Sequence, residues 1–186
     1  MPENKTDTLP NIQCIGPDTL DISLIHHSKE PPVTPTIAAF DPGITGALAL
    51  LGDPDFDEIQ LFDLPSANGE LDPAALARIL KDAAPSRAIV EQVGAMPKQG
   101  VTSTFKFGRA YGTVLGVLGA LAIPTVRVRP AIWKKHFGLL NQPKDAARAL
   151  ALRLYPNLQG LHLKKHHGRA DALLLARFLL ETNKTA

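Results

Sequence analysis

The sequence predicts an α/β fold in which a five-stranded mixed sheet is flanked by helices. Short apolar runs of β-type residues alternate with longer segments that have the 3.6-residue spacing of amphipathic helices. The first three runs, near 36–41, 46–51 and 58–63, follow one another closely, as expected for antiparallel hairpin strands. Two later runs are each reached through a helical segment, and a helical crossover makes such strands parallel.

The first helix is predicted near 72–83. Asp72 suits the N-cap, Pro73 suits the first helical position, and the apolar residues that follow are spaced at i, i+3 and i+4. This helix connects the hairpin strands with a fourth strand near 87–92. The later elements are predicted as a helix near 102–122, a strand at 124–128, a short helix from Pro130, and helices at roughly 143–155 and 167–182, the last with an apolar stripe of Ala172, Leu175, Ala176 and Leu179.

Residues 1–35 are predicted to form a disordered or loosely ordered extension, and residues 36–186 a single folded domain. Residues 1–36 hold six of the 16 prolines and show no sustained periodicity. The apolar stretch Leu20–Ile25 is too short for a signal or a membrane span. The single cysteine, Cys14, excludes an intrachain disulfide framework. We therefore expect an intracellular protein without membrane association, cytoplasmic by default, with an organelle left open.

Acidic residues lie at the end of two predicted strands and in the last helix. Asp41 ends the first strand, Glu91 ends the fourth, and Asp171 belongs to the last helix. Neighbouring parallel strands lie about 4.8 Å apart and end at the same edge, so two of these carboxylates are expected to be close. Such a cluster needs a counter-charge, and Mg²⁺ or Mn²⁺ prefers oxygen ligands. Together the three predict a divalent-metal site, although each alone is more simply a solvated strand end or turn residue.

Charge is unevenly distributed along the chain. The net charge is only +2, but residues 37–97 carry 3 Lys and Arg against 10 Asp and Glu, whereas residues 98–186 carry 15 against 3. A basic half joined to an acidic, metal-ready half suits an enzyme that acts on a polyanion. An ordinary solvated basic surface explains the charge equally well, and it is the predicted metal site that favours nucleic acid.

Four short motifs follow one another along the chain. They are Asp41-Pro-Gly-Ile-Thr-Gly, Val90-Glu91-Gln92-Val93, Phe107-Gly108-Arg109-Ala110-Tyr111-Gly112 and Ala170-Asp171-Ala172-Leu173. In their order and spacing, residues 37–180 resemble the RuvC family of Holliday-junction resolvases, within the RNase H-like superfamily. The run from Lys165 to Leu174 is more similar to the phage and plastid branches than to the bacterial branch.

The resemblance implies an RNase H-like nuclease domain over residues 36–186. It implies a crossover junction endodeoxyribonuclease, a homodimer that binds four-way DNA junctions and cuts them by paired symmetric nicks. It also implies Asp41, Glu91 and Asp171 as ligands of divalent metal, Mg²⁺ or Mn²⁺, with two ions in each active site.

The chain departs from the bacterial pattern at the start of the last helix. A fourth acidic residue is expected there one turn before the last Asp, and Gly168 stands in its place. His167 lies at i to i+4 from Asp171, on the same helix face. We expect it to act in catalysis by binding metal, positioning water or contacting the scissile phosphate, with a solvent-exposed helix start as the alternative. His166 is the weaker candidate for this role.

A second departure follows the Gln-Val pair. Bacterial resolvases place an aromatic wedge there to stack on a base, and Gly94 stands at that position. Met96, Phe105 and Phe107 are alternative wedges, although each is more simply explained by core or loop packing.

Gly108, Gly112 and Gly116 recur every four residues along the long helix. Each costs about 1 kcal/mol of helix stability relative to Ala, so close packing must compensate. We expect packing against the sheet, with a partner helix in a dimer as the alternative.

Basic residues around the predicted site are expected to contact DNA phosphates. Lys134 and Lys135 follow the start of the short helix, Lys144 is placed at the start of the next helix, and these positions match phosphate contacts in the family that the chain resembles. Other cations flank the site in loops or helix starts, where backbone N–H groups also favour phosphate. The full predicted DNA-binding set is Lys98, Lys134, Lys135, Lys144, Lys164, Lys165 and Arg169.

Other classes share some of these features. Actin-like ATPases and sugar kinases also have an Asp-x-Gly-x-x-Gly hairpin, but they need two such domains and this chain has one copy of the pattern. A non-catalytic junction-binding protein fits the missing fourth carboxylate. Another RNase H-like nuclease, acting on branched DNA or on RNA, fits the acidic core.

Overall fold

The structure is a computed structural model, and it describes residues 36–52, 58–92, 94 and 100–183. All of them belong to the compact unit that spans Thr34–Ala186. The predicted extension over residues 1–35 lies outside the described residues, so its disorder stays a prediction. Lys98 and Met96 also lie outside them.

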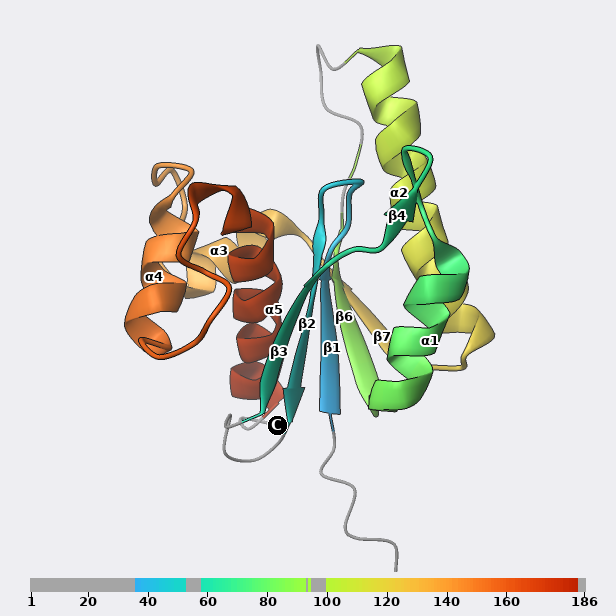
Figure 1. Cartoon of the computed structure of the whole chain (residues 1–186). Helices are drawn as coiled ribbons and strands as arrows, with labels where there is room; N and C mark the ends of the chain where they lie inside the picture. The colour runs from blue at the N-terminus through green and yellow to red at the C-terminus, as the bar shows by residue number, and fades with distance from the viewer. Residues whose placement is uncertain (1–35, 53–57, 93, 95–99, 184–186) are drawn as a thin grey trace, which may run out of the picture. The chain divides into compact units, whose positions relative to one another are not determined.

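A five-stranded mixed sheet lies at the centre of this unit (Figure 1). Strands β1 (Thr36–Asp41), β2 (Ala47–Gly52) and β3 (Ile59–Asp63) pair antiparallel, while β6 (Arg87–Glu91) pairs parallel with β1, and β7 (Thr125–Val128) pairs parallel with β6. The strand order is β3-β2-β1-β6-β7. The predicted fold class is therefore confirmed, including its division into antiparallel and parallel parts.

Helices cover both faces of the sheet. On one face lie α1 (Pro73–Ala83) and α2 (Val101–Ala120), and on the other lies α5 (His167–Asn183), with α3 (Pro130–His136) and α4 (Ala146–Leu154) beyond it (Figure 1). Asp72 caps α1 as predicted, its side chain accepting hydrogen bonds from two backbone N–H groups at 2.9 and 3.0 Å.

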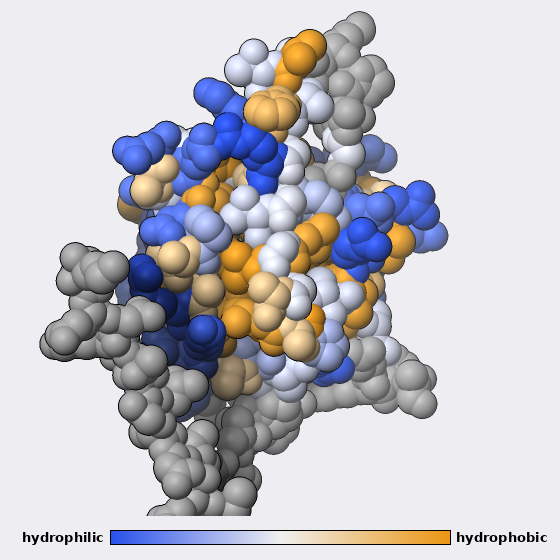
Figure 2. Space-filling view, turned by 90° about the vertical axis from the view of Figure 1, so that its right-hand side faces the viewer, coloured by the Kyte–Doolittle hydropathy of each residue, from blue (hydrophilic) through white to orange (hydrophobic). Residues whose placement is uncertain are grey.

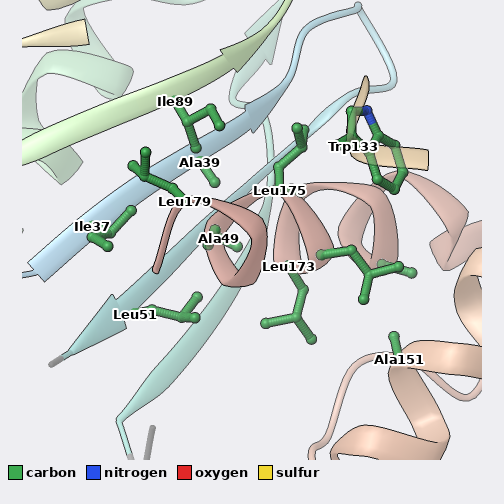
Figure 3. Packing of buried hydrophobic residues seen from close by; sticks show 14 of the residues in the cluster. Ile37, Ala39, Ala49, Leu51, Ile89, Trp133, Ala151, Leu173, Leu175 and Leu179 are labelled. Atoms are coloured by element: carbon green, nitrogen blue, oxygen red, sulfur yellow. The ribbon is translucent and has the colours of Figure 1, made fainter. Parts of the chain in front are cut away.

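The strands separate two apolar cores because successive side chains point to opposite faces. In β1, Ile37 and Ala39 belong to the core on the α5 side, whereas Ala38 and Phe40 belong to the core under α1 and α2. Helix α5 packs on β1 and β2, and Figure 3 shows Leu179 of α5 beside Ala39 of β1. The predicted apolar stripe of α5 is buried, and its members are Ala172, Leu175, Ala176 and Leu179. Burial of this helix fixes the position of its first turns, where the site residues lie.

The structure adds elements that the sequence reasoning missed. A small ribbon of β4 (Ser66–Ala67) and β5 (Glu70–Leu71) turns at Asn68-Gly69, where both residues have positive φ, 53° and 77°. Asn-Gly is the preferred sequence for such a turn, so the signal was present. A 3₁₀ turn, η2 (Lys164–His166), precedes α5. Lys144 does not begin a helix as expected but lies in the turn before α4.

The expectation that the α2 glycines pack on the sheet is wrong. Gly108, Gly112 and Gly116 are exposed, and a Cβ at any of them would meet nothing within 4 Å. The side of α2 that enters the core carries Ala110, Val114, Val117 and Leu118 instead. The glycine face is therefore turned outward. On the side where α1 and α2 cover the sheet, apolar and neutral residues gather in the middle of the surface, with hydrophilic residues around them (Figure 2).

Candidate active site

Asp41, Glu91 and Asp171 come together at one edge of the sheet. β1 and β6 pair in parallel with Phe40 opposite Val90, so Asp41 and Glu91 end neighbouring strands at the same edge. Asp171 lies near the start of α5, which packs against β1. The negative charges of Glu91 and Asp171 both raise the pKa of Asp41, so the three carboxylates lie within electrostatic range of one another.

Burial raises the pKa of all three carboxyl groups. The pKa of Asp41 rises to about 7, mainly through burial and then through the negative charges of Glu91 and Asp171. The pKa of Asp171 rises to about 6, again through burial, with the charge of Lys134 opposing the shift. Burial also raises the pKa of Glu91. The raised pKa values show that burial and mutual repulsion outweigh the positive charge of Lys134 at this site.

Gly168 lets α5 approach Asp41 closely. A Cβ at this position would lie 3.0 Å from Asp41 Oδ2 and 3.5 Å from the backbone oxygen of Thr45. The residue is buried within the first turn of α5. Gly168 is therefore more than the absence of a fourth acid, because any larger side chain there displaces Asp41.

Helix α3 contributes two residues to the site. Trp133 is fully buried and donates a hydrogen bond from Nε1 to Glu91 Oε1 at 2.9 Å. The charge of Lys134 lowers the pKa of Asp41, Glu91 and Asp171. Lys134 was predicted only as a phosphate contact, and the structure makes it the main counter-charge as well. Trp133 was missed, and the signal for it was a lone Trp directly before Lys in a short helix.

His167 lies between two hollows in the surface. The first, of about 180 Å³, is lined by Asp171, Lys134, Lys144 and His167 among others. His167 Nδ1 lies 3.3 Å from the backbone oxygen of Lys164, and this oxygen can only accept a hydrogen bond. His166 instead accepts the backbone N–H of Leu163 through Nδ1 at 3.4 Å. Of the two histidines, His167 lines the hollow that contains the predicted metal ligand Asp171.

The predicted DNA-binding cations fall into different surroundings. Lys144, Lys164 and Lys165 line the second hollow, of about 470 Å³, together with His167 and Asp145. Lys135 is exposed on α3. Arg169 instead holds both oxygens of Asp63 at 2.6 and 2.8 Å, which ties α5 to the end of β3. The structure thus gives Arg169 a structural partner that the sequence reasoning did not foresee, and its contact with DNA stays a prediction.

The candidate wedges differ in exposure. Phe105 is 64% exposed near the start of α2, with the Arg109 guanidinium 5.7 Å from its ring centroid. Phe107 is half-buried and lies against Gly43 in the β1–β2 turn. Of the aromatic candidates that the structure describes, Phe105 is therefore the exposed one.

The donor set fits a hard divalent cation by its chemistry. Glu91 is buried, Asp41 and Asp171 are half-buried, and all three carboxyl groups have raised pKa values, so they gain most from a positive charge among them. In the described part of the chain, no three His, Cys, Asp or Glu side chains form a ready-made ligand cluster for one ion.

The geometry invites comparison with known proteins. No protein-family model matches the chain. It is 35% identical over 114 residues, 58% of its length, to the chloroplastic Holliday junction resolvase MOC1 of Chlamydomonas reinhardtii, and it spans 13% of the length of that relative.

Solved structures match over most of the chain. RuvC of Thermus thermophilus, in complex with a Holliday junction substrate, has a TM-score of 0.62 and 19% identity over 81% of this chain and 95% of that chain. The chain has the fold of RuvC. The fowlpox virus resolvase, in complex with Holliday junction DNA, has a TM-score of 0.51 and 16% identity over 80% of this chain and 98% of that chain. The RuvC resemblance, and its plastid-type side, are confirmed.

Proposed function

We propose that the chain is a structure-selective endonuclease that resolves four-way DNA junctions by metal-dependent phosphodiester hydrolysis. The observation that carries this proposal is the group of three carboxylates with raised pKa values at one edge of a RuvC-like sheet, with basic hollows beside it. The names of the relatives support the substrate, since one is a Holliday junction resolvase and two solved structures hold junction DNA.

Asp41, Glu91 and Asp171 would hold the divalent cations, Mg²⁺ or Mn²⁺. The negative charges of both other carboxylates act on Asp41, so Asp41 would hold a cation together with either of them. When bound, such ions activate the attacking water and stabilise the negative charge on the departing 3′ oxygen. The expected product is a nick that DNA ligase seals.

Lys134 and His167 would act on the scissile phosphate. Both line the hollow that contains Asp171, so a phosphate placed against the carboxylates meets them there. Lys134 offers positive charge and three donors, and His167 offers Nε2 as a contact for phosphate or water. Of the two histidines, His167 is therefore the one proposed for catalysis.

The neighbouring phosphates would follow the cations of the second hollow. Lys144 and His167 line both hollows, so the two adjoin, and Lys164 and Lys165 extend the basic surface away from the carboxylates. Cations in this arrangement bind the DNA backbone without reading sequence. Lys98, Lys135 and Arg169 complete the predicted DNA-binding set.

A homodimer would place two such sites on one junction. Resolution needs two cuts related by symmetry, which a C₂ dimer supplies. The outward glycine face of α2, with Gly108, Gly112 and Gly116, supports the dimer reading, because a partner helix close to these glycines compensates their cost of about 1 kcal/mol each.

A panel of labelled substrates tests the proposal. Four-way junctions, flaps, duplexes and RNA–DNA hybrids are incubated with the chain in Mg²⁺, Mn²⁺ or Ca²⁺. We expect cleavage of the junction in Mg²⁺ and Mn²⁺ and binding alone in Ca²⁺, because a looser coordination sphere misplaces the attacking water. Junction binding without cleavage in any metal identifies a non-catalytic binding protein, and preferred cleavage of flaps or RNA identifies another nuclease of this fold.

The location in the cell stays a prediction. No helix among the described residues is long and apolar enough to cross a membrane. The Chlamydomonas relative is a chloroplastic protein. We retain an intracellular site, in the cytoplasm or an organelle, as the proposal.

A further inference from the structure

Trp133 connects the core with the carboxylate edge. It is the only tryptophan in the chain and is fully buried among the residues of the α5-side core (Figure 3). Its Nε1 donates to Glu91 Oε1 at 2.9 Å across 42 positions of sequence. A phenylalanine fills much of the same apolar space, so packing alone does not explain an indole with its N–H turned to a carboxylate.

Helix α3 is fixed to α5, which makes Trp133 a rigid donor. His136, at the end of α3, lies 2.7 Å from Glu181 Oε2, measured from Nε2. Its ring also meets Phe137 and Phe178 edge-on, with centroids 4.7 and 5.3 Å away. These contacts join the C-terminal end of α3, the helix that carries Trp133, to α5.

The same indole also contacts the main cation of the site. Lys134 Nζ lies 5.1 Å from the Trp133 ring centroid, over its face. Such a contact attracts the ammonium to the ring and restricts where the lysine reaches. One side chain thus contacts both an acid and a base of the candidate active site.

We propose that Trp133 is a positioning residue that holds Glu91 in a single orientation for metal binding. The indole N–H engages Oε1 and so restricts the rotation of the carboxylate that would face a cation. A ligand held in this way loses less freedom when the metal binds, and its coordination geometry is set in advance. This inference rests on the proposed metal-dependent function and adds a residue that acts through Glu91.

The wild-type protein supplies the first test, because its single tryptophan is an optical probe beside the proposed ligand. The full chain, without DNA, is titrated with Mn²⁺ or Ca²⁺ while the emission of the indole is recorded. We expect a saturable change in emission that disappears in Glu91→Gln. Glutamine still accepts the indole N–H but lacks the charge that binds the cation, so the protein stays folded. An equal change in Glu91→Gln overturns the proposal.

The second test removes only the N–H. Trp133→Phe keeps an aromatic ring, and we expect its Mn²⁺ affinity, measured by calorimetry, to fall by about 10-fold or more, within the range usual for partners of metal ligands. The Mg²⁺ concentration for half-maximal junction cleavage should rise by the same factor, while junction binding in Ca²⁺-free buffer stays unchanged. Wild-type Mn²⁺ affinity in Trp133→Phe overturns the proposal.

A matched control separates positioning from core packing. Leu179→Ala opens a cavity in the same core without touching the site (Figure 3). It should lower the melting temperature at least as much as Trp133→Phe and leave Mn²⁺ affinity unchanged. Equal loss of affinity in both variants reduces Trp133 to a packing residue. A wild-type protein that binds no divalent cation instead refutes the proposed function itself, so the two failures are distinguishable.

Discussion

Replacing Asp41 by Asn is predicted to stabilise the metal-free fold. In the folded chain the pKa of Asp41 is raised to about 7 by burial and by Glu91 and Asp171, against 3.8 for an unperturbed Asp. The folded state therefore keeps the Asp41 proton to a higher pH than the unfolded state does. Stability from this group is complete below about pH 4 and is lost as the pH rises to about 7.

The size of the effect follows from the shift. A difference of about 3 pH units, at about 1.4 kcal/mol for each, corresponds to about 4 kcal/mol at pH 8. Because the protein and nearby water relax around the charge, we expect Asp41→Asn to recover about 2 to 4 kcal/mol in the absence of metal. For a domain of this size that is a rise in melting temperature of about 5–15 °C. The same substitution should abolish cleavage.

Thermal or urea unfolding in EDTA measures the effect, at pH 8 and at pH 4.5. The gain should be large at pH 8 and small at pH 4.5, where the wild-type carboxyl is already protonated in the folded state. Asp63→Asn is the matched control, because ion pairing with Arg169 lowers the pKa of Asp63, and its loss should not stabilise the fold at pH 8. An Asp41→Asn protein that is no more stable than wild type at pH 8 would refute the electrostatic account of the site.

Three further predictions follow from the geometry. Gly168→Ala places a Cβ 3.0 Å from Asp41 Oδ2, so kcat for junction cleavage should fall by about 10-fold while junction binding stays unchanged. Full activity of this variant would show that Asp41 tolerates displacement. Lys134→Gln should weaken junction binding and reduce the slope of log affinity against log salt by about one. Lys81 is exposed on α1, and the control variant Lys81→Gln should leave the slope unchanged. Equal slopes in both variants would place Lys134 away from DNA. Gly112→Leu should convert a dimer to a monomer in sedimentation velocity and abolish paired cutting. Arg78→Leu, at an exposed position of α1, is the control. A Gly112→Leu protein that remains a dimer would exclude the glycine face of α2 as the interface.

The fold was predictable because its periodicities are strong. The strands with alternating or continuous apolar residues, and helix α1 with its Asp72 cap, carry their signals within a few neighbouring residues. Parallel pairing of β1 and β6 followed from the helical crossover, and it brought Asp41 and Glu91 to one edge without any knowledge of side-chain contacts.

The predictions that were wrong or incomplete concern which side of a helix or strand faces the core. Glycines spaced by four predict a close approach but not its partner, and α2 turned Gly108, Gly112 and Gly116 outward because Val114 and Leu118 fill the inward side. Likewise, Arg169 finds Asp63 across 106 positions of sequence. Contacts of this kind arise from tertiary packing and have no local signal.

The site shows the same division. Carboxylates at element ends were recognisable, as was His167 by its helical spacing from Asp171. The close contact of Gly168 with Asp41 was not, because a glycine in a motif gives no indication of what would meet its missing side chain. The Trp133 hydrogen bond was also hidden, since it joins a core residue to a catalytic candidate on another element.

Cleavage of a supercoiled plasmid that extrudes a cruciform tests the central claim most directly. The cruciform is a four-way junction, and two coordinated nicks across it linearise the plasmid, whereas single or independent nicks give open circles. With Mg²⁺ we predict linear product carrying ligatable ends, and none with Asp41→Asn. Open circles alone, or linear product from Asp41→Asn at the wild-type rate, would contradict a paired, carboxylate-dependent resolvase.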